Sequence, residues 1–333
     1  MEERRLGRSG LCVSRLALGT MTWGHDGDDE IARDQLVTFM ESGGTLVDTA
    51  AGYGDGVAEE MLGMLLGHVA SRDQVIVASR AGTGWPVGGP GGVDGPAGGA
   101  VDTSRRALLD TLDASLNRLG TDHIDLWLVH GFDPATPLSE TLSALDFAVD
   151  TGRTRYVGVA SCSGWQLAGA ATWQCAVPGR AAVVAAAAEY SLLARGVERE
   201  VVPAAAHLGV GLLPWSPLGR GVLTGKYRHG VPADSRAASP ELAPFVEAYF
   251  DPRSRRIVDA VATAADGLGV PALEVALAWV RDQPGVAAPV VGARTNAQLR
   301  AALASESLTL PDEIRQALDD VSRPPMGHPE RPQ

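Results

Sequence analysis

Residues 124–161 read IDLWLVHGFDPATPLSETLSALDFAVDTGRTRYVGVAS and contain the clearest repeat unit of the chain. Ile124 to His130 and Tyr156 to Ser161 are apolar runs of strand length, and between them Ser139 to Thr151 carries apolar residues at three- and four-residue spacing. Near-continuous apolarity is typical of parallel strands that helices cover on both faces. Three- and four-residue spacing is typical of an amphipathic helix. The stretch therefore predicts a strand, a helix and a second, parallel strand.

The same alternation runs through the whole chain. The eight runs of strand length are Leu16 to Gly19, Thr45 to Ala50, Gln74 to Ser79, Ile124 to His130, Tyr156 to Ser161, Ala182 to Glu189, Val210 to Trp215, and Ala288 to Gly292. The segments of helical period are Asp29 to Ser42, Val57 to Ala70, Ser104 to Leu119, Ser139 to Thr151, Gly164 to Trp173, Val197 to His207, Arg255 to Leu268, Ala272 to Asp282, Asn296 to Ala304, and Asp312 to Val321. Eight such units predict a (β/α)8 TIM barrel, an α/β fold that forms one domain over residues 1–323. No GxGxxG follows the first strand, which disfavours the open dinucleotide-binding fold.

Three segments fall outside this repeat. Arg4 to Val13 is expected to form an N-terminal hairpin. Ala81 to Val101 and Ser216 to Arg253 are rich in Gly or Pro, and both follow predicted strand ends. Long loops in compact domains are often functional, and barrels build their active sites at the C-terminal ends of the strands. Residues 324–333 are expected to be a flexible tail.

Composition narrows the classes of function. The formal net charge of −12 disfavours nucleic acid and anionic membranes as partners, because both attract concentrated Lys and Arg. No apolar stretch reaches the roughly 18 residues of a membrane span, and no signal peptide is evident, so the protein is expected in the cytoplasm. The three cysteines lack paired metal-ligand spacing, which predicts reduced thiols and no metal site. Lys226 is the single lysine of the chain.

Polar and aromatic residues gather where the predicted strands end. They are Asp48 and Tyr53 after the second strand, Arg80 after the third, His130 after the fourth, Ser161 after the fifth, Glu189 and Tyr190 after the sixth, Trp215 and Ser216 after the seventh, and Gly292 and Arg294 after the eighth. In a barrel of this kind these side chains should converge on one face.

At these residues the sequence resembles the aldo-keto reductases, in particular a bacterial branch similar to the potassium-channel beta subunits and to the reductases of deoxysugar and natural-product pathways. Five segments carry the resemblance, in family order and across nearly the whole chain: Asp48 to Gly54 (DTAAGYG), Ser115 to Leu126 (SLNRLGTDHIDL), Thr136 to Leu142 (TPLSETL), Glu189 to Leu193 (EYSLL) and Trp215 to Tyr227 (WSPLGRGVLTGKY).

The resemblance implies a catalytic role for four residues. Tyr53 would be the general acid that protonates the carbonyl oxygen as hydride reaches the carbon. His130 would hydrogen-bond that oxygen, and Asp48 would steady a cation beside Tyr53. A neighbouring cation favours the ionised form of a tyrosine, whose ordinary pKa is about 10. That cation is a lysine in the family motif, whereas this chain has Arg80.

The exchange of lysine for arginine leaves two expectations open. Arginine supplies positive charge, but it is planar, larger and effectively always protonated. Arg80 either acts on Tyr53 in place of the lysine, or binds Asp48 and leaves the site with little turnover.

The resemblance also implies a nicotinamide cofactor. Tyr190 would stack on the nicotinamide ring, the loop from Ser216 to Gly225 would cover the pyrophosphate, and Arg294 with Gln298 would hold the 2′-phosphate of NADPH, so NADH is the weaker candidate. The complete set of cofactor-binding residues implied is Gly19, Thr20, Met21, Asp48, Ser161, Tyr190, Trp215, Ser216, Pro217, Leu218, Gly219, Gly221, Lys226, Gly292, Arg294 and Gln298.

Three polar contacts of the family pattern are altered. Ala160-Ser161 replaces Ser-Asn after the fifth strand, Ala187 replaces a glutamine in the sixth, and Ala301-Ala302 replaces Glu-Asn near the adenine. The nicotinamide would be held more loosely as a result. The substrate pocket is expected to contain Trp23, Trp85 and Phe132 beside Tyr53 and His130.

The function implied is NADPH-dependent reduction of a ketone or aldehyde on a small organic molecule. The alternative is a nicotinamide-binding redox sensor or regulatory subunit with little turnover, which Arg80 favours and the retained Asp48, Tyr53 and His130 oppose. A third reading, a barrel hydrolase or lyase, lacks support. The sequence has no metal-ligand cluster at the predicted strand ends and no evident second carboxylate opposite Asp48. The sequence leaves the substrate and the oligomeric state open.

Overall fold

Eight parallel strands form one curled sheet in the part of the chain that the structure describes. This structure is a computed structural model, and it describes residues 1–24, 29–82, 101–233, 235–240, 242–325 and 327. The strands are β3 (Ala17–Gly19), β4 (Leu46–Asp48), β5 (Ile76–Ala81), β6 (Ile124–His130), β7 (Thr154–Ala160), β8 (Val183–Glu189), β9 (Gly211–Trp215) and β10 (Val290–Gly292). Their order in the sheet is β10-β3-β4-β5-β6-β7-β8-β9. A bridge between Leu212 and Val286 brings the two edges together. The predicted (β/α)8 barrel is confirmed.

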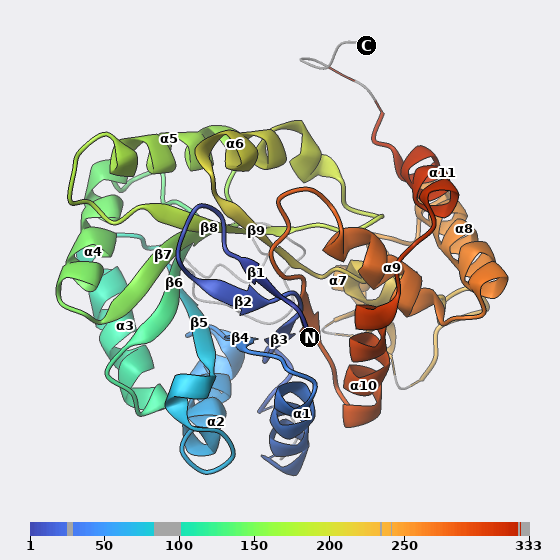
Figure 1. Cartoon of the computed structure of the whole chain (residues 1–333), viewed down its shortest axis with the longest axis horizontal. Coiled ribbons are helices and arrows are strands. Elements are labelled where there is room, and N and C mark those ends of the chain that lie inside the picture. Colours follow the sequence, from blue (N-terminus) through green and yellow to red (C-terminus); the bar gives the residue numbers. More distant parts are fainter. Residues whose placement is uncertain (25–28, 83–100, 234, 241, 326, 328–333) are drawn as a thin grey trace.

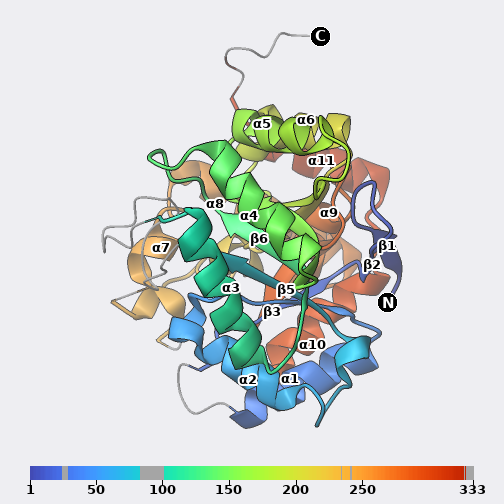
Figure 2. The same cartoon turned by 90° about the vertical axis from the view of Figure 1, so that its left-hand side faces the viewer.

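Helices surround this barrel on its outer side (Figures 1 and 2). They are α1 (Asp29–Glu41), α2 (Val57–Leu65), α3 (Arg105–Leu119), α4 (Leu138–Asp150), α5 (Gly164–Cys175), α6 (Val201–Leu208), α7 (Ala243–Glu247), α8 (Pro252–Leu268), α9 (Ala272–Arg281), α10 (Asn296–Ala304) and α11 (Asp312–Ser322). Short 3-10 helices precede α2 (Tyr53–Gly56), follow α2 (Arg72–Gln74), precede α6 (Gly196–Arg199), follow β9 (Gly219–Thr224), precede α7 (Arg236–Ala238) and follow α10 (Ser305–Ser307). The segment from Ser216 to Arg253, expected as a loop, therefore contains α7 and two 3-10 helices.

The strand register aligns the residues at the C-terminal ends of the strands. Asp48 is paired with Gly19 on one side and with Ala78 on the other. His130 is paired with Ala160. Because parallel strands end on the same face of a barrel, the residues at these ends lie around one opening.

Element boundaries differ from the sequence prediction at several places, of which three concern helix ends and the position of Arg80. The helix expected to reach Ala70 ends at Leu65, because Leu66 is extended and Gly67 turns the chain with a φ of +89°. The helix expected from Val197 is interrupted at Glu200, whose φ of −134° is not helical. β5 continues to Ala81, so Arg80 lies within the strand instead of after it.

Two clusters of buried apolar side chains fill the molecule. Leu126 and Leu128 belong to the smaller cluster inside the barrel, whereas Trp127 and Val129 belong to the larger one between the barrel and the helices. This alternation is what a strand covered on both faces requires. The smaller cluster also contains Leu6 from the N-terminal hairpin.

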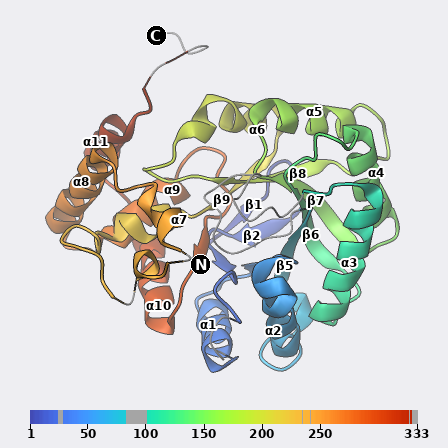
Figure 3. The same cartoon turned by 180° about the vertical axis from the view of Figure 1, so that it is seen from behind.

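The predicted hairpin closes the end of the barrel opposite the strand C-termini. β1 (Glu3–Arg5) and β2 (Cys12–Ser14) pair antiparallel. Gly7 has a φ of +58°, and a Cβ there would lie 2.4 Å from the carbonyl oxygen of Gly209, so only glycine fits this approach. Figure 1 looks onto the end with the hairpin, and Figure 3 onto the opposite end, where α7 lies.

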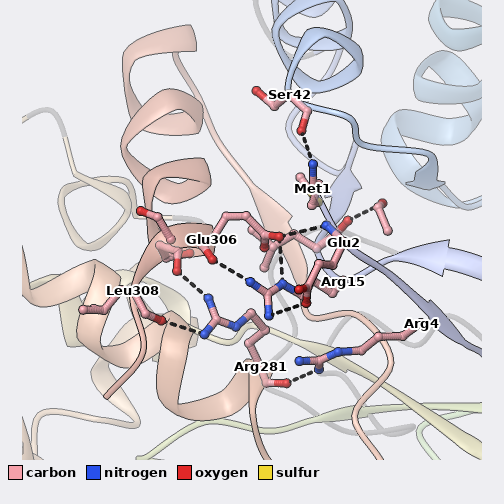
Figure 4. Close-up of polar contacts among 12 residues, drawn as sticks. Met1, Glu2, Arg4, Arg15, Ser42, Arg281, Glu306 and Leu308 are labelled. Carbon is pink, nitrogen blue, oxygen red and sulfur yellow. Dashed lines mark hydrogen bonds and ion pairs between the residues drawn. The ribbon is translucent and has the colours of Figure 1, made fainter. Parts of the chain in front are cut away.

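Arginine side chains hold the N-terminal segment against the C-terminal helices (Figure 4). Arg15 donates to Glu306 Oε1 at 2.7 Å, and Arg4 donates to the carbonyl oxygen of Arg281 at 2.5 Å. Arg281 is 1% exposed, and it donates to the carbonyl oxygens of Ser305 and of Leu308. The bonds of Arg281 satisfy a buried guanidinium with carbonyl groups distant in sequence, and those of Arg4 and Arg15 attach the N-terminal segment to the C-terminal part of the chain.

No single helix among the described residues is long and apolar enough to cross a membrane; α8 and α9 pass that test only as a pair bent by 103°.

Candidate active site

A cavity of about 790 Å³ opens at the C-terminal ends of the strands. This volume lies within the range of ligand-binding pockets, roughly 300 to 1,000 Å³. The four residues expected to be catalytic, Asp48, Tyr53, Arg80 and His130, all line it. They come from β4, from the turn after it, from β5 and from β6.

Arg80 and Asp48 form a buried ion pair in this cavity. Nη2 of Arg80 contacts Oδ1 of Asp48, and their side chains are 4% and 3% exposed. Burial raises the pKa of Asp48, and the charge of Arg80 opposes that rise. Burial alone would lower the pKa of Arg80, but the charges of Asp48 and Tyr53 raise it above its ordinary value. Arg80 is therefore a permanent cation, and its Nε has no hydrogen-bond partner among the described residues.

Tyr53 lies at the start of the turn that follows β4. Its backbone N–H donates to the carbonyl oxygen of Ala50 at 3.1 Å, and Gly54 and Asp55 after it have φ values of +56° and +53°. This tight turn places the ring in the cavity wall, where the residue is 9% exposed. Burial raises the pKa of Tyr53 to about 12, against the opposing field of Arg80. The phenol is thus protonated throughout the neutral range.

His130 is the last residue of β6, and it is neutral. Burial lowers the pKa of His130 to about 3, and the charge of Arg80 acts in the same direction. Its Nε2 lies 3.0 Å from Oγ of Ser161. Ser161 has a φ of +52°, a conformation that non-glycine residues adopt at some cost. Ser161 therefore occupies a strained position from which its hydroxyl contacts His130 and the cavity.

Cations line the other part of the cavity wall. Lys226, Arg236 and Arg294 all border it, and the described residues place no carboxylate within ion-pair distance of any of them. Burial lowers the pKa of Arg236, and the nearby charge of Arg294 lowers it further. Cations that repel one another in a cavity wall without an acidic partner favour a bound anion. Ala301 and Ala302 complete this end.

A buried ion pair holds the loop after β9 in place. Arg220 donates to both carboxylate oxygens of Glu189, at 2.9 and 2.7 Å, and to the carbonyl oxygen of Phe245 at 2.6 Å. Its guanidinium lies 3.9 Å from the centre of the Phe245 ring. The hydroxyl of Tyr249 donates to Glu189 at 2.8 Å. Arg220 does this from a left-handed backbone conformation, with a φ of +60°.

We expect Arg220→Ala to lower the free energy of unfolding by about 3 kcal/mol, because it leaves a partly buried carboxylate without its cation. Arg220→Gly should lose about 1 kcal/mol less, because glycine adopts a positive φ without strain. The measurement is urea-induced unfolding. Arg228→Ala is the matched control, since its ion pair with Asp259 is exposed and contributes less than about 1 kcal/mol. Equal losses for Arg220→Ala and Arg228→Ala would contradict this view of the loop.

Most residues predicted to bind the cofactor border the cavity. These are Gly19, Met21, Asp48, Ser161, Trp215, Ser216, Pro217, Leu218, Gly221, Lys226, Gly292, Arg294 and Gln298. Thr20, Gly219 and Tyr190 are not among the described lining residues. Thr20 is buried and donates to the carbonyl oxygen of Asp48, and Gly219 is packed against Leu193.

Tyr190, which the resemblance predicts to stack on the nicotinamide ring, is not among the described lining residues of the cavity. Its ring is 3% exposed, packs edge-on against Trp279, and its hydroxyl donates to Glu198 at 2.7 Å. The two residues before it, Ala188 and Glu189, do border the cavity. The aromatic that lines this part of the cavity is Trp215, whose Nε1 has no hydrogen-bond partner among the described residues.

Two of the aromatics expected in the substrate pocket pack against other residues. Trp23 is 1% exposed, and its Nε1 donates to Oε1 of Gln35 at 2.7 Å. Phe132 packs against the larger apolar cluster. Neither is among the described lining residues of the cavity. Trp85 lies outside the described residues.

Three charged residues of the site were missed in the sequence analysis as functional residues. Glu189 was predicted only to end a strand, and Arg220 was named only as part of the segment from Trp215 to Tyr227. No role was predicted for Arg236. Arg220 between two glycines is a signal that could have been used, because such a position indicates an unusual backbone conformation. Arg236 lies in the proline-rich segment, where no periodicity indicates which side chains point inward.

The cavity at the strand ends brings together an aspartate–arginine pair, a protonated tyrosine and a neutral histidine. Enzymes with a (β/α)8 barrel have their active sites at this face. The family model described as "Aldo/keto reductase family" matches residues 15–323. The chain belongs to this family, and the resemblance predicted from the sequence is confirmed.

Similar proteins include both enzymes and a channel subunit. The chain is 34% identical to "Uncharacterized oxidoreductase YrpG" of Bacillus subtilis, with 98% of each protein covered. It is 33% identical to "Probable voltage-gated potassium channel subunit beta" of Arabidopsis thaliana, covering 100% of this chain and 99% of the relative. It is 31% identical to "Versiconal hemiacetal acetate reductase" of Aspergillus parasiticus, with 99% of each covered. As a family member, this chain is an oxidoreductase that acts on carbonyl compounds with a nicotinamide cofactor.

Proposed function

We propose that the chain is an NADPH-dependent reductase of a ketone or aldehyde on a small organic molecule. The observation that carries the proposal is that one cavity brings two sets of residues together. Asp48, Tyr53, Arg80 and His130 line it, and so do the cations Lys226, Arg236 and Arg294. An acid beside cations that have no acidic partner among the described residues suits carbonyl reduction with a phosphorylated cofactor.

The residues present fit a nicotinamide cofactor. Cations that no described carboxylate pairs with suit its phosphates, and Arg294 beside Gln298 suits a 2′-phosphate. The backbone N–H of Arg294 donates to Oε1 of Gln298 at 3.0 Å, which fixes these two residues together. When bound, the cofactor would supply the hydride.

The chain's own residues would supply the proton and the orientation. Tyr53, whose raised pKa keeps it protonated, would donate its phenolic proton to the carbonyl oxygen as the carbon gains the hydride, and the product is an alcohol. Neutral His130 has an N–H that can donate to the same oxygen. Arg80, fixed by Asp48, would stabilise the tyrosinate left behind, and solvent would return its proton.

NADPH should bind more tightly than NADH. A charge-assisted pair between Arg294 and the 2′-phosphate contributes about 1.5 to 3 kcal/mol, or roughly ten- to a hundredfold in affinity. Arg294→Ala should remove this preference and leave the affinity for NADH nearly unchanged. The measurement is a fluorescence titration of both cofactors, with Arg300→Ala as the control arginine on the exposed side of α10. Equal affinities of the wild type for NADPH and NADH would exclude Arg294 from the proposed site.

We also propose the cytoplasm as the compartment, since NADPH is an intracellular cofactor.

The second candidate function is a nicotinamide-binding sensor with little turnover. The contact of Arg80 with Asp48 favours the sensor. Tyr53 and His130 on the same cavity favour the reductase. The test is whether bound NADPH is consumed when a carbonyl compound is added.

A further inference from the structure

A buried carboxylate outside the cavity has no role in the mechanism described so far. Glu59 lies in the first turn of α2 and is 0% exposed. It is not among the described residues that line the cavity, and neither are its partners Ser79 on β5 and Arg118 on α3. α3 packs against both α2 and β5 (Figures 1 and 2). Because a glutamate is seldom fully buried unless it is paired, its contacts indicate what this side chain holds in place.

Both carboxylate oxygens of Glu59 have hydrogen-bond partners. Oε1 accepts from Oγ of the buried Ser79 at 2.6 Å. Oε2 accepts from Nε of Arg118 at 2.8 Å, and Nη2 of Arg118 lies 2.7 Å from the same oxygen. Arg118 also donates to Oγ of Ser115 at 3.3 Å. Glu59 therefore joins α2, α3 and β5 at one buried point, through a charge-assisted pair of the strong, two-pronged kind.

On β5, the contact of Glu59 lies beside the cation of the site. Ser79 precedes Arg80, and successive residues of a strand point to opposite faces. Arg80 lines the cavity, whereas Ser79 donates to Glu59 on the side of the helices. The backbone carbonyl oxygen of Arg80 accepts from the backbone N–H of Ala51 at 3.3 Å, in the segment that leads to Tyr53. Glu59 is thus bonded to the residue next to Arg80.

On α2, the same pair lies beside the turn that carries Tyr53. This turn ends at Gly56, and α2 begins at Val57, whose backbone N–H donates to the carbonyl oxygen of Tyr53. Gly56 has a φ of +97°, and a Cβ there would lie 2.7 Å from Cδ and from Nε of Arg118. The side chain of Arg118 therefore lies directly against the last residue of the turn before it reaches Glu59. A movement of the ion pair would move the turn as well.

We propose that Glu59 is a positioning residue that holds Tyr53 at a fixed distance from Arg80. Its hydrogen bond from Ser79 fixes the strand side of this distance, and its pair with Arg118 fixes the turn side. The consequence for catalysis rests on the proposed function, because the charge of Arg80 stabilises a tyrosinate only at close range. A displacement of a reacting group by about 1 Å can slow a reaction on the order of a hundredfold. Glu59 thus sets the rate of proton transfer without contacting substrate or cofactor.

Fluorine NMR of protein labelled with fluorotyrosine tests the position of Tyr53 without any turnover. The chain has five tyrosines, and the resonance of Tyr53 is the one that Tyr53→Phe removes. Glu59→Gln keeps the shape of the side chain but removes its charge, so it should shift or broaden this resonance and leave the other four in place. Glu306→Gln is the matched control, because Glu306 also pairs with an arginine, Arg15, at 2.7 Å and its side chain is 20% exposed. The control should leave the Tyr53 resonance unchanged.

Single-turnover reduction of an aromatic aldehyde by bound NADPH tests the consequence for the rate. Glu59→Gln should be about tenfold to a hundredfold slower than the wild type. Its solvent deuterium isotope effect should be larger, because proton transfer from a displaced Tyr53 becomes the slower step. A loss of folded protein would lower the amplitude and leave the isotope effect unchanged. The affinity for NADPH should stay near the wild-type value, since Glu59 is not among the described lining residues.

A double variant separates positioning from stability. Glu59→Gln combined with Arg118→Met leaves no unpaired charge, so its unfolding free energy should be close to that of the wild type, while its turnover stays as slow as that of Glu59→Gln. A double variant that regains the wild-type rate together with the stability would overturn the proposal, and so would a Tyr53 resonance that Glu59→Gln leaves unchanged. A wild type that does not oxidise NADPH would contradict the proposed function instead, and the fluorine resonance would still decide whether Glu59 positions Tyr53.

Discussion

Replacing Tyr53 with phenylalanine should lower kcat for carbonyl reduction by about 10²- to 10⁴-fold, because only the transferable proton is removed. The affinity for NADPH should stay within roughly twofold of the wild type, since Phe fills the same space in the cavity wall. The measurement is steady-state reduction of an aromatic aldehyde beside a cofactor titration.

Tyr190→Phe is the matched control for this variant. Tyr190 is another buried tyrosine, but its hydroxyl donates to Glu198 away from the cavity. We expect it to leave kcat unchanged and to lower stability by about 1 kcal/mol through the lost hydrogen bond. If Tyr53→Phe retained full activity on a good substrate, the proton donor would have to be a different group.

Arg80 should be replaceable by lysine but not by methionine. Arg80→Met leaves Asp48 buried without its cation, which should cost about 3 to 5 kcal/mol of stability. It also removes the positive field that opposes the rise in the pKa of Tyr53, so reduction should slow at least about tenfold. Arg80→Lys keeps the charge, and a compact ammonium can contact both Asp48 and Tyr53, so activity should equal or exceed that of the wild type.

A pH-rate profile and a double variant separate the two effects of Arg80. Since Tyr53 has a pKa of about 12, its protonated form is complete below pH 10, and kcat/KM for reduction should be flat across the neutral range. Alcohol oxidation needs the tyrosinate, so its kcat/KM should rise about tenfold per pH unit up to about pH 11. Asp48→Asn in the Arg80→Met background should restore stability, because no unpaired charge remains buried. Identical profiles in the wild type, Arg80→Lys and Arg80→Met would exclude position 80 from the site.

The sequence predicts which residues stand at the strand ends better than it predicts where their side chains point. His130 ends β6 at the predicted residue, and it lines the cavity as expected. Tyr190 also follows a strand end, yet its ring packs against Trp279 and its hydroxyl donates to Glu198. A one-residue difference reverses the direction of a side chain at a strand end, and the apolar run before Glu189 does not reveal its phase.

Loop residues that act through long-range contacts were harder still to predict. Arg220 donates to Glu189, which lies 31 residues earlier in the sequence. It also donates to the carbonyl oxygen of Phe245, in a short helix that the sequence does not predict. The barrel itself could be predicted, because strand and helix periodicity repeats along the chain. The contact that Arg80 makes could not be predicted, because an arginine at this position of the strand can reach either Asp48 or Tyr53.

A single-turnover experiment tests the proposed reductase most directly. Protein loaded with one equivalent of NADPH is mixed with excess aromatic aldehyde, and the nicotinamide absorbance and the alcohol product are followed together. The proposed function predicts that the bound NADPH is oxidised fully, with one alcohol formed per cofactor, and that the same mixture with Tyr53→Phe is at least about 10²-fold slower. Tight binding of NADPH without its oxidation by any carbonyl tested would contradict the reductase and favour the sensor.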